Sequence, residues 1–324
     1  MRSAIAGLAV ILSSTLLSAG QPRFGARVDL HVLSVVARTG DDLAAKGLVA
    51  SDFEVFEDGK RVAISTFAEV DSNTPTPLDE GRFVVLLLDD LGTHPQFTVR
   101  IKDIARDFVR RMGPKDVMSV VLLNGSIGVT TRNPDEVLRA IDQSNGYGKA
   151  VLSSGGAGAH AIRTIASLAR QLAEVQHRRK VLVCIGSAMT FNSSTHGGYR
   201  SEVASALREA ARANLTAYVI DPLGLTPKAS LSSRAIDRGA LAADASVVAK
   251  GAGFADYQDG FAFETGGFTF ANTNLYQDAI ARVWEESGSY YLLGYEPTTR
   301  NSRRHVIEVK TNRPGVTARA RRTR

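Results

Sequence analysis

The amino-acid sequence predicts an α/β protein with a doubly wound, mostly parallel sheet, accompanied by a small β-sandwich-like unit that the N- and C-terminal segments form together. Three features lead to this prediction. Strand and helix patterns alternate through the centre of the chain, over residues 82–287. The first central strand is a continuous apolar run, which is typical of a strand buried on both faces. Segments with strand character stand on either side, at 27–70 and 288–324.

The N-terminus has the layout of a secretory signal peptide over residues 1–20. Arg2 supplies a positive start, Ala4–Leu17 is an uncharged run too short for a normal membrane span, and small residues follow it. We therefore expect an exported protein, periplasmic or extracellular, whose mature chain has no membrane span. With Cys184 as the single cysteine, no internal disulfide can form, and its apolar neighbours indicate a small buried hydrophobic residue.

The charge balance does not favour a nucleic-acid-binding protein. The 39 lysine and arginine residues exceed the 33 acidic residues by enough to give a net charge of only +6. Much of the excess lies near the C-terminus, where arginines alternate with small residues rather than with aromatic ones. We expect them to line the solvent face of a last strand, with contact to an anionic surface as an alternative. They are Arg313, Arg319, Arg321, Arg322 and Arg324.

The N-terminal β unit, residues 27–70, begins with an apolar strand pattern at Val28–Arg38. Phe53–Glu57 alternates with a period of two residues, and Asp58-Gly59 is a hairpin-turn signal. The apolar residues that follow, Val62–Phe67, predict one returning strand. This part of the chain is therefore expected to be a small antiparallel unit.

The central domain, residues 82–287, follows a proline-containing linker at 71–81. Its alternation of strands and helices favours a parallel sheet with helices on both faces. The expected strands are Phe83–Leu88, Asp116–Leu123, Ile127–Thr131, Lys180–Ile185 and Leu215–Asp221. The expected helices are Gln96–Met112, Pro134–Ile141, Ala159–Val175, Ser201–Ala213 and Asn274–Glu286. A Gly/Ala/Ser-rich insertion at 222–260 interrupts this order, and loops of such length are usually functional or disordered.

The C-terminal segment, residues 288–324, returns to strand patterns at Tyr290–Tyr295, His305–Lys310 and Val316–Arg321. A lone two- or three-stranded unit is marginally stable in water. We therefore expect this segment to pack on the N-terminal β unit.

Three stretches of the chain resemble a bacterial family of exported proteins that carry a von Willebrand factor A-related domain. They are Ser51–Lys60, the Thr265-Gly266-Gly267 turn with its following helix, and Ser289–Pro297 with the basic end. The segment Phe83–Glu286 itself resembles a von Willebrand factor A domain in its strand order and in the aspartate at the end of its first strand. This resemblance implies a non-enzymatic, secreted module that binds a protein partner, with a role in adhesion.

The resemblance also implies a metal-ion-dependent adhesion site at the carboxyl edge of the sheet. There an Asp-x-Ser-x-Ser loop, a threonine and a further aspartate bind Mg²⁺ through the oxygen ligands that this ion prefers. This sequence has Asp89 and Thr93, but Leu91 replaces the first serine, Ser187 replaces the last aspartate, and the second loop, 154–159, has no threonine. Asp89, Thr93 and Ser187 are thus the candidate ligands of a degenerate site for Mg²⁺ or Mn²⁺, and a scaffold that has lost its metal site is the favoured interpretation.

Two other functions fit parts of the sequence. One is a structural component of an envelope assembly, built from the paired terminal β segments. The other is a haloacid dehalogenase-like phosphohydrolase, because Val84–Thr93 resembles the strand-end motif in which the first aspartate, here Asp89, is the nucleophile. That motif has a second aspartate two positions later as acid and base, and Leu91 occupies this position, so proton transfer to the leaving group lacks a carrier.

Overall fold

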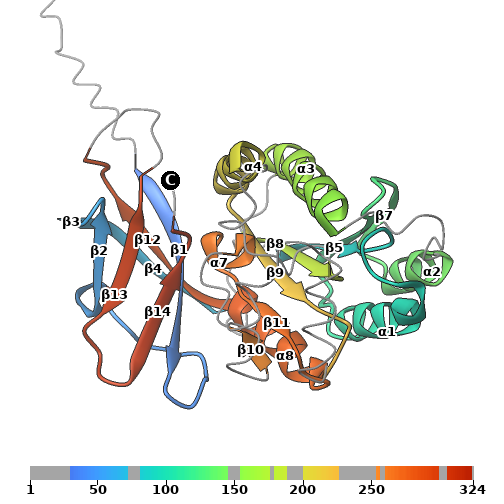
Figure 1. Ribbon diagram of the computed structural model, residues 1–324. Helices are drawn as coiled ribbons and strands as arrows, with labels where there is room; N and C mark the ends of the chain where they lie inside the picture. The colour runs from blue at the N-terminus through green and yellow to red at the C-terminus, as the bar shows by residue number, and fades with distance from the viewer. Residues whose placement is uncertain are drawn as a thin grey trace, which may run out of the picture.

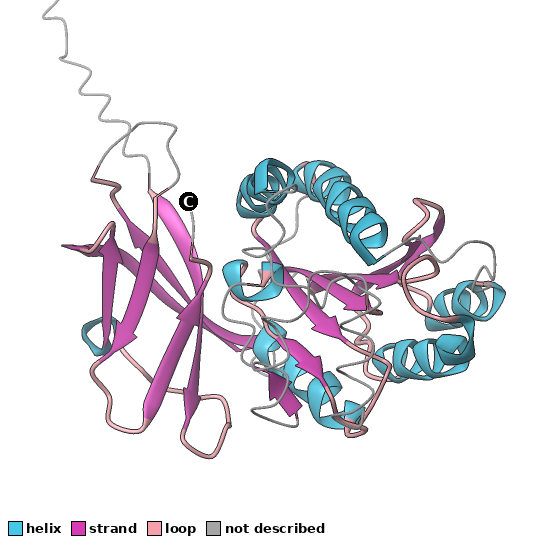
Figure 2. Ribbon diagram, in the orientation of Figure 1, coloured by secondary structure: helices cyan, strands magenta, loops and turns pink. Residues whose placement is uncertain are grey.

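The computed structural model describes residues 30–71, 81–144, 154–175, 179–187, 200–225, 253–255, 260–298 and 305–322. These residues form a seven-stranded sheet with helices and two smaller sheets of four and three strands. Figure 1 shows an α/β unit and a β unit side by side, and Figure 2 shows the long helices confined to the α/β unit. The predicted signal peptide, and nearly all of the linker and of the insertion, lie outside the described residues.

The α/β unit contains the predicted mostly parallel sheet, which is confirmed. Its strand order is β10-β11-β9-β8-β5-β6-β7. The inner strands pair in parallel, whereas β7 and β10 pair antiparallel at the two edges. The strands are β5 (Arg82–Leu88), β6 (Val117–Leu122), β7 (Ile127–Thr131), β8 (Arg179–Ile185), β9 (Leu215–Ile220), β10 (Gly253–Ala255) and β11 (Thr269–Ala271).

Helices cover both faces of this sheet, as expected for a doubly wound fold. The helices are α1 (Thr98–Val109), α2 (Pro134–Gln143), α3 (Ser154–Ala173), α4 (Arg200–Ala213), α7 (Phe261–Glu264) and α8 (Tyr276–Gly288). One hydrophobic cluster joins α1, α2 and α8 to the sheet, and a second joins α3, α4 and α7 to the opposite face. In β5, side chains alternate between the clusters: Val84 and Leu86 enter the first, Val85 and Leu87 the second. This two-sided burial explains why β5 is apolar throughout.

The helix boundaries follow from local chemistry at their ends. At α2 the side chain of Asn133 accepts a hydrogen bond from the Asp135 backbone N–H, and Pro134 occupies the first helical position. Proline suits that position because its missing N–H would have no partner within the helix.

Within the described residues, no helix combines the length and the apolar character that crossing a membrane requires.

The β unit pairs strands from the two ends of the chain. Its four-stranded sheet has the order β14-β1-β12-β4, and its three-stranded sheet has the order β13-β2-β3. One hydrophobic cluster, which includes Val35, Val55 and Leu293, draws residues from both sheets. The strands are β1 (His31–Thr39), β2 (Phe53–Glu57), β3 (Lys60–Val62), β4 (Ile64–Asp71), β12 (Ser289–Tyr295), β13 (Ile307–Thr311) and β14 (Val316–Ala320). A short 3-10 helix, η1 (Ala50–Asp52), precedes β2.

The prediction of one strand over Val62–Phe67 is wrong. β3 ends at Val62 and pairs with β2, whereas β4 begins at Ile64 and pairs with β12 in the other sheet. The chain therefore changes sheets at Ala63. The apolar residues before and after Ala63 face the core that the two sheets share. The pattern of apolar residues therefore continues across Ala63, and no turn signal marks the change of sheet.

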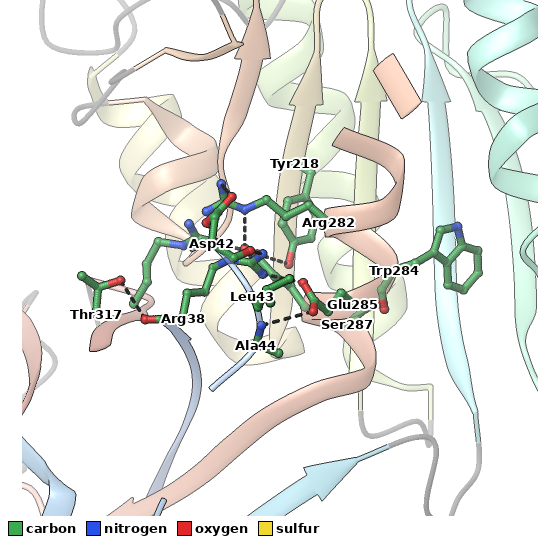
Figure 3. Close-up of polar contacts among 12 residues, drawn as sticks. Arg38, Asp42, Leu43, Ala44, Tyr218, Arg282, Trp284, Glu285, Ser287 and Thr317 are labelled. Carbon is green, nitrogen blue, oxygen red and sulfur yellow. Dashed lines mark hydrogen bonds and ion pairs between the residues drawn. The ribbon is translucent and has the colours of Figure 1, made fainter. Parts of the chain in front are cut away.

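The two units meet at a seam that we define by Arg38 and Arg319 of the β unit and Arg282 and Glu286 of α8. The Glu286 side chain is 0% exposed. Its Oε1 lies 2.8 Å from Arg282 Nε and 3.7 Å from Arg38 Nη1, while Oε2 pairs with Arg319 and accepts a hydrogen bond from the Tyr218 hydroxyl at 3.2 Å. Figure 3 shows Arg38, Arg282 and Tyr218 converging from different elements.

The expected solvent-facing position of the terminal arginines is wrong for two of them. Arg319 pairs with Glu286 and also donates to the Gly266 carbonyl at 3.0 Å. Arg321 donates to the Ala211 carbonyl at 3.0 Å and to the Val32 carbonyl at 2.8 Å. The reason is that the α/β unit covers the end of β14. The alternation of arginines with small residues predicts a face of the strand that is exposed to solvent, but in the structure this face contacts the α/β unit.

Candidate functional site

The candidate site lies where the order of the parallel strands reverses. β5 has β6 on one side and β8 on the other, so successive connections leave it in opposite directions. Ligands of open α/β sheets bind at the carboxyl edge beside such a reversal, because the loops there diverge and leave a crevice. The loops after β5 and β8 meet at this point, where the Asp89 backbone N–H donates to the Ile185 carbonyl at 3.0 Å.

The structure brings the three predicted site residues together. Thr93 Oγ1 donates to Asp89 Oδ2 at 2.7 Å and accepts from the Ser187 backbone N–H at 2.9 Å. The Ser187 hydroxyl lies 3.3 Å from Thr93 Oγ1 and 3.3 Å from the Gly92 carbonyl oxygen. The other carboxylate oxygen, Asp89 Oδ1, accepts from the backbone N–H groups of Leu91 at 3.2 Å and Gly92 at 2.6 Å. The side chains thus tie the first loop to the loop after β8.

Gly186 makes this close approach of the two loops feasible. A β-carbon at this position would lie 2.0 Å from the β-carbon of Asp89. Only glycine can occupy such a position without moving the backbone of one loop. The Gly186 N–H also donates to the Ile220 carbonyl at 3.0 Å, which holds the loop in line with β9.

Two further buried carboxylates stand at the same edge but serve other loops. Asp90 turns toward β6, where its Oδ1 accepts from the Asn124 backbone N–H at 3.0 Å. Burial raises the pKa of Asp90, because removal from water penalises the charged form more than its backbone hydrogen bonds favour it. Asp221, after β9, accepts from the Leu223 N–H at 3.0 Å. These hydrogen bonds hold the loops that follow β6 and β9.

This donor set does not fit a divalent cation. Mg²⁺ and Mn²⁺ need several oxygen ligands converging on one point, with negative charge to offset their own. Asp89 is the one carboxylate of the three-residue cluster, and both its oxygens accept hydrogen bonds from its own loop. Thr93 directs its hydroxyl proton to that carboxylate. Among the described residues, no group of three or more His, Cys, Asp or Glu side chains could hold a metal ion.

Titration with Mg²⁺ or Mn²⁺ is therefore expected to leave the melting temperature of the full chain unchanged. An ion that bound the folded state would raise it by mass action. Thermal unfolding with each chloride salt, against NaCl of equal ionic strength, makes the measurement. A saturable rise that is present in the wild type and absent in Asp89→Asn would contradict this expectation.

Three exposed apolar side chains lie in segments that follow strands at the same edge of the sheet. Val99, Leu225 and Leu275 are 68%, 60% and 66% exposed, and they belong to the loops or helix starts that follow β5, β9 and β11. Arg100 links these segments, because its guanidinium donates to the Pro222 carbonyl at 3.1 Å and lies 3.5 Å from the Tyr276 hydroxyl. We call Val99, Arg100, Leu225 and Leu275 the edge surface.

The sequence pointed to the carboxyl edge and to the insertion 222–260, which contains Leu225, but not to Val99, Arg100 or Leu275. A cavity of about 480 Å³ lies beside the edge surface, lined by residues that include Phe97, Val99 and Arg100. Single apolar residues in loops, or on the exposed side of a helix start as at Val99, carry no periodic signal, so only the fold shows that these come to one edge.

The sequence-based interpretation of Cys184 as a buried hydrophobic residue agrees with its surroundings. The residue lies in β8 within the cluster under α3 and α4. Burial raises the pKa of its thiol, with the negative charge of Asp89 adding to the effect. The thiol therefore stays protonated, and a protonated thiol is a poor nucleophile.

Comparisons with known proteins do not identify a family. No family model matches the sequence, and no curated protein matches it. Among solved structures, the manganese-loaded TRAP protein of Plasmodium vivax is similar at 8% identity and a TM-score of 0.39, over 79% of this chain and 96% of that one. The TFIIH p34 N-terminal domain is similar at 13% identity and a TM-score of 0.28, over 44% of this chain and 81% of that one. Both likenesses are weak. The fold assignment rests on the strand order and pairing described above, and membership of the bacterial exported family stays a prediction.

Proposed function

We propose that the chain is an exported, non-enzymatic protein-binding module that contacts its partner through the edge surface without a metal ion. The observation that carries this proposal is that Val99, Leu225 and Leu275, all more than half exposed, belong to segments that Arg100 joins at the carboxyl edge of the sheet. Exposed apolar side chains rimmed by polar groups are typical of surfaces that bind other proteins.

The hydrogen bonds within the cluster of Asp89, Thr93 and Ser187 favour a structural role for it at the same edge of the sheet. Its donors and acceptors are directed at one another and join the loops after β5 and β8. A rigid edge of this kind lowers the entropy lost when a partner binds. The proposal therefore assigns Asp89 to positioning the loops, and neither to a metal ion nor to phosphoryl transfer.

In this proposal the β unit is a β-sandwich-like domain that supports the α/β unit. Its two sheets share one core, and α8 continues directly into β12, Gly288 being followed by Ser289. Export rests on the pattern of residues 1–20, and the partner would accordingly be a periplasmic or extracellular protein.

Leu275→Asp is expected to abolish capture of the partner by the immobilised full chain. The substitution replaces an apolar side chain with a carboxylate, which would have to lose its water when the partner binds. Envelope proteins of the source organism would be applied, and the bound set quantified by mass spectrometry. Val306→Asp is the matched control, since Val306 is 52% exposed and lies in the β unit beside β13. It should retain the wild-type set, as should the wild type in the presence of EDTA.

Two outcomes contradict the proposal. Identical bound sets for Leu275→Asp and the wild type would show that the edge surface takes no part. Loss of binding with Val306→Asp alone would favour a contact through the β unit, as expected of a structural component of an envelope assembly.

A further inference from the structure

A cavity of about 390 Å³ opens at the junction of the two units, away from the edge surface. Lys46 lines it from the loop after β1, Arg82 from the start of β5, and Arg111 from the segment after α1. Trp284 and Glu285, near the end of α8, also line it. Cations from separate elements of both units therefore share one cavity.

Glu285 is the one acidic residue among the described residues that line the cavity, and its side chain contacts the β unit. Glu285 Oε2 lies 2.9 Å from Arg38 Nη1, and Oε1 accepts from the Ala44 backbone N–H at 3.1 Å. Glu285 thus has ordered partners on the β unit, although Arg38 also pairs with Asp42 and Glu286, and the charge of Glu285 acts on Lys46 as well.

Arg82 is held in place by its surroundings. Its Nε pairs with Asp116 at 3.1 Å, and Nη1 donates to the Trp284 carbonyl at 3.2 Å. The guanidinium carbon lies 4.3 Å from the centre of the Trp284 ring, a cation–π distance. A cation fixed in this way loses little entropy when a ligand binds to its remaining N–H groups.

Lys46 and Arg111 retain donors for a ligand. The Lys46 ammonium lies 2.7 Å from Asp71, which uses one of its three N–H groups. Arg111 is exposed, and in the described part of the chain no carboxylate lies within ion-pair distance of it. An arginine presents five N–H donors in a planar arrangement that suits carboxylate and phosphate oxygens.

We propose that this cavity binds a small multivalent oxyanion, of the phosphate or polycarboxylate class, between Lys46, Arg82 and Arg111. The cavity has the volume of a small-ligand site. A ligand there contacts both units at once, so its binding also holds them together. The proposal does not depend on the proposed function, because it uses neither the edge surface nor Asp89.

The test is calorimetric titration of the full chain with pyrophosphate at constant ionic strength, set with KCl. Saturable binding to one site is expected. Arg111→Ala should weaken it about tenfold or more, since it removes a charge-assisted hydrogen bond. Lys46→Ala, from the other unit, should weaken it as well. The matched control is Arg110→Ala, which removes the same charge one residue away, at an exposed side chain that pairs with Asp107 and is not among the lining residues.

Each alternative outcome overturns the proposal. Absence of saturable heat means that the cavity does not bind a multivalent oxyanion. Equal weakening by Arg110→Ala and Arg111→Ala means that the anion responds to net charge alone. Weakening by Arg111→Ala without any change in Lys46→Ala means that the anion does not lie between the two units.

Discussion

Glu286→Gln is expected to lower the free energy of unfolding by about 3 to 5 kcal/mol, the cost of breaking a buried ion pair by removing one partner. The amide keeps the shape of the side chain but removes the charge that Arg38, Arg282 and Arg319 face at the seam. Arg319 would then lose the one carboxylate that it pairs with among the described residues, while Arg38 and Arg282 would keep their ion pairs with Asp42 and, for Arg38, Glu285. Urea denaturation followed by far-ultraviolet circular dichroism measures the change.

Glu285→Gln is the matched control for this prediction. Glu285 is the preceding residue of the same helix, but its side chain is 35% exposed and it pairs at the seam with Arg38 alone. A partly solvated ion pair is worth about 1 kcal/mol or less, so a much smaller loss is expected. Equal denaturation midpoints for Glu286→Gln and Glu285→Gln would show that the buried ion pairs of Glu286 contribute no more to the free energy of unfolding than the exposed pair of Glu285.

The contribution of Glu286 should also appear in the pH dependence of the free energy of unfolding of the wild type. Burial alone would raise the pKa of Glu286, but the charges of Arg319, Arg282 and Arg38 outweigh it and lower the pKa below the ordinary value of 4.5. A depressed folded-state pKa stabilises the protein above the unfolded pKa, and this contribution is lost as the pH falls through the folded value. Glu286→Gln should therefore lose less stability than the wild type on acidification below pH 4.5.

The α/β unit was largely predictable from the sequence because its signals are local and repeated. Continuous apolar strands and amphipathic helices set the element order, and parallel strands place their carboxyl ends at one edge. For that reason the proximity of Asp89, Thr93 and Ser187 followed from their positions at strand ends. Their mutual hydrogen bonds did not follow, because the direction of a loop side chain has no sequence periodicity.

The seam could not be predicted, and Arg319 shows why. Two-residue alternation in β14 separates the faces of the strand, but it cannot tell whether the polar face meets water or another unit. Glu286 likewise lies near the end of an amphipathic helix, where a charged residue ordinarily suggests solvent. The change of sheet between β3 and β4 escaped prediction for a similar reason, since one strand's residue pattern does not specify its pairing partners.

The Thr265-Gly266-Gly267 turn is structural, and its contacts explain why these residue types stand together. The Thr265 hydroxyl donates to the Ala262 carbonyl at 2.8 Å and accepts from the Ala217 N–H of β9 at 2.9 Å. Gly266 has φ of +87°, a conformation that favours glycine. A β-carbon on Gly267 would lie 1.8 Å from the Ala217 carbonyl oxygen. The turn thus brings α7 and β11 into direct backbone contact with β9.

Gly267→Ala is accordingly expected to cost about 4 kcal/mol or more, in the range that marks a steric conflict in the core. The atom it would strike belongs to the β9 backbone and cannot rotate away, so β11 must leave its place beside β9. Hydrogen exchange at the Val219 amide, which donates to the Phe268 carbonyl at 3.0 Å, should accelerate more than at amides of β6. Gly47→Ala provides the comparison: φ is +69°, but no atom lies within 4 Å of the added carbon, so only backbone strain of about 1 to 2 kcal/mol is expected. If the two substitutions cost the same, close packing of the turn against β9 is not what requires glycine at position 267.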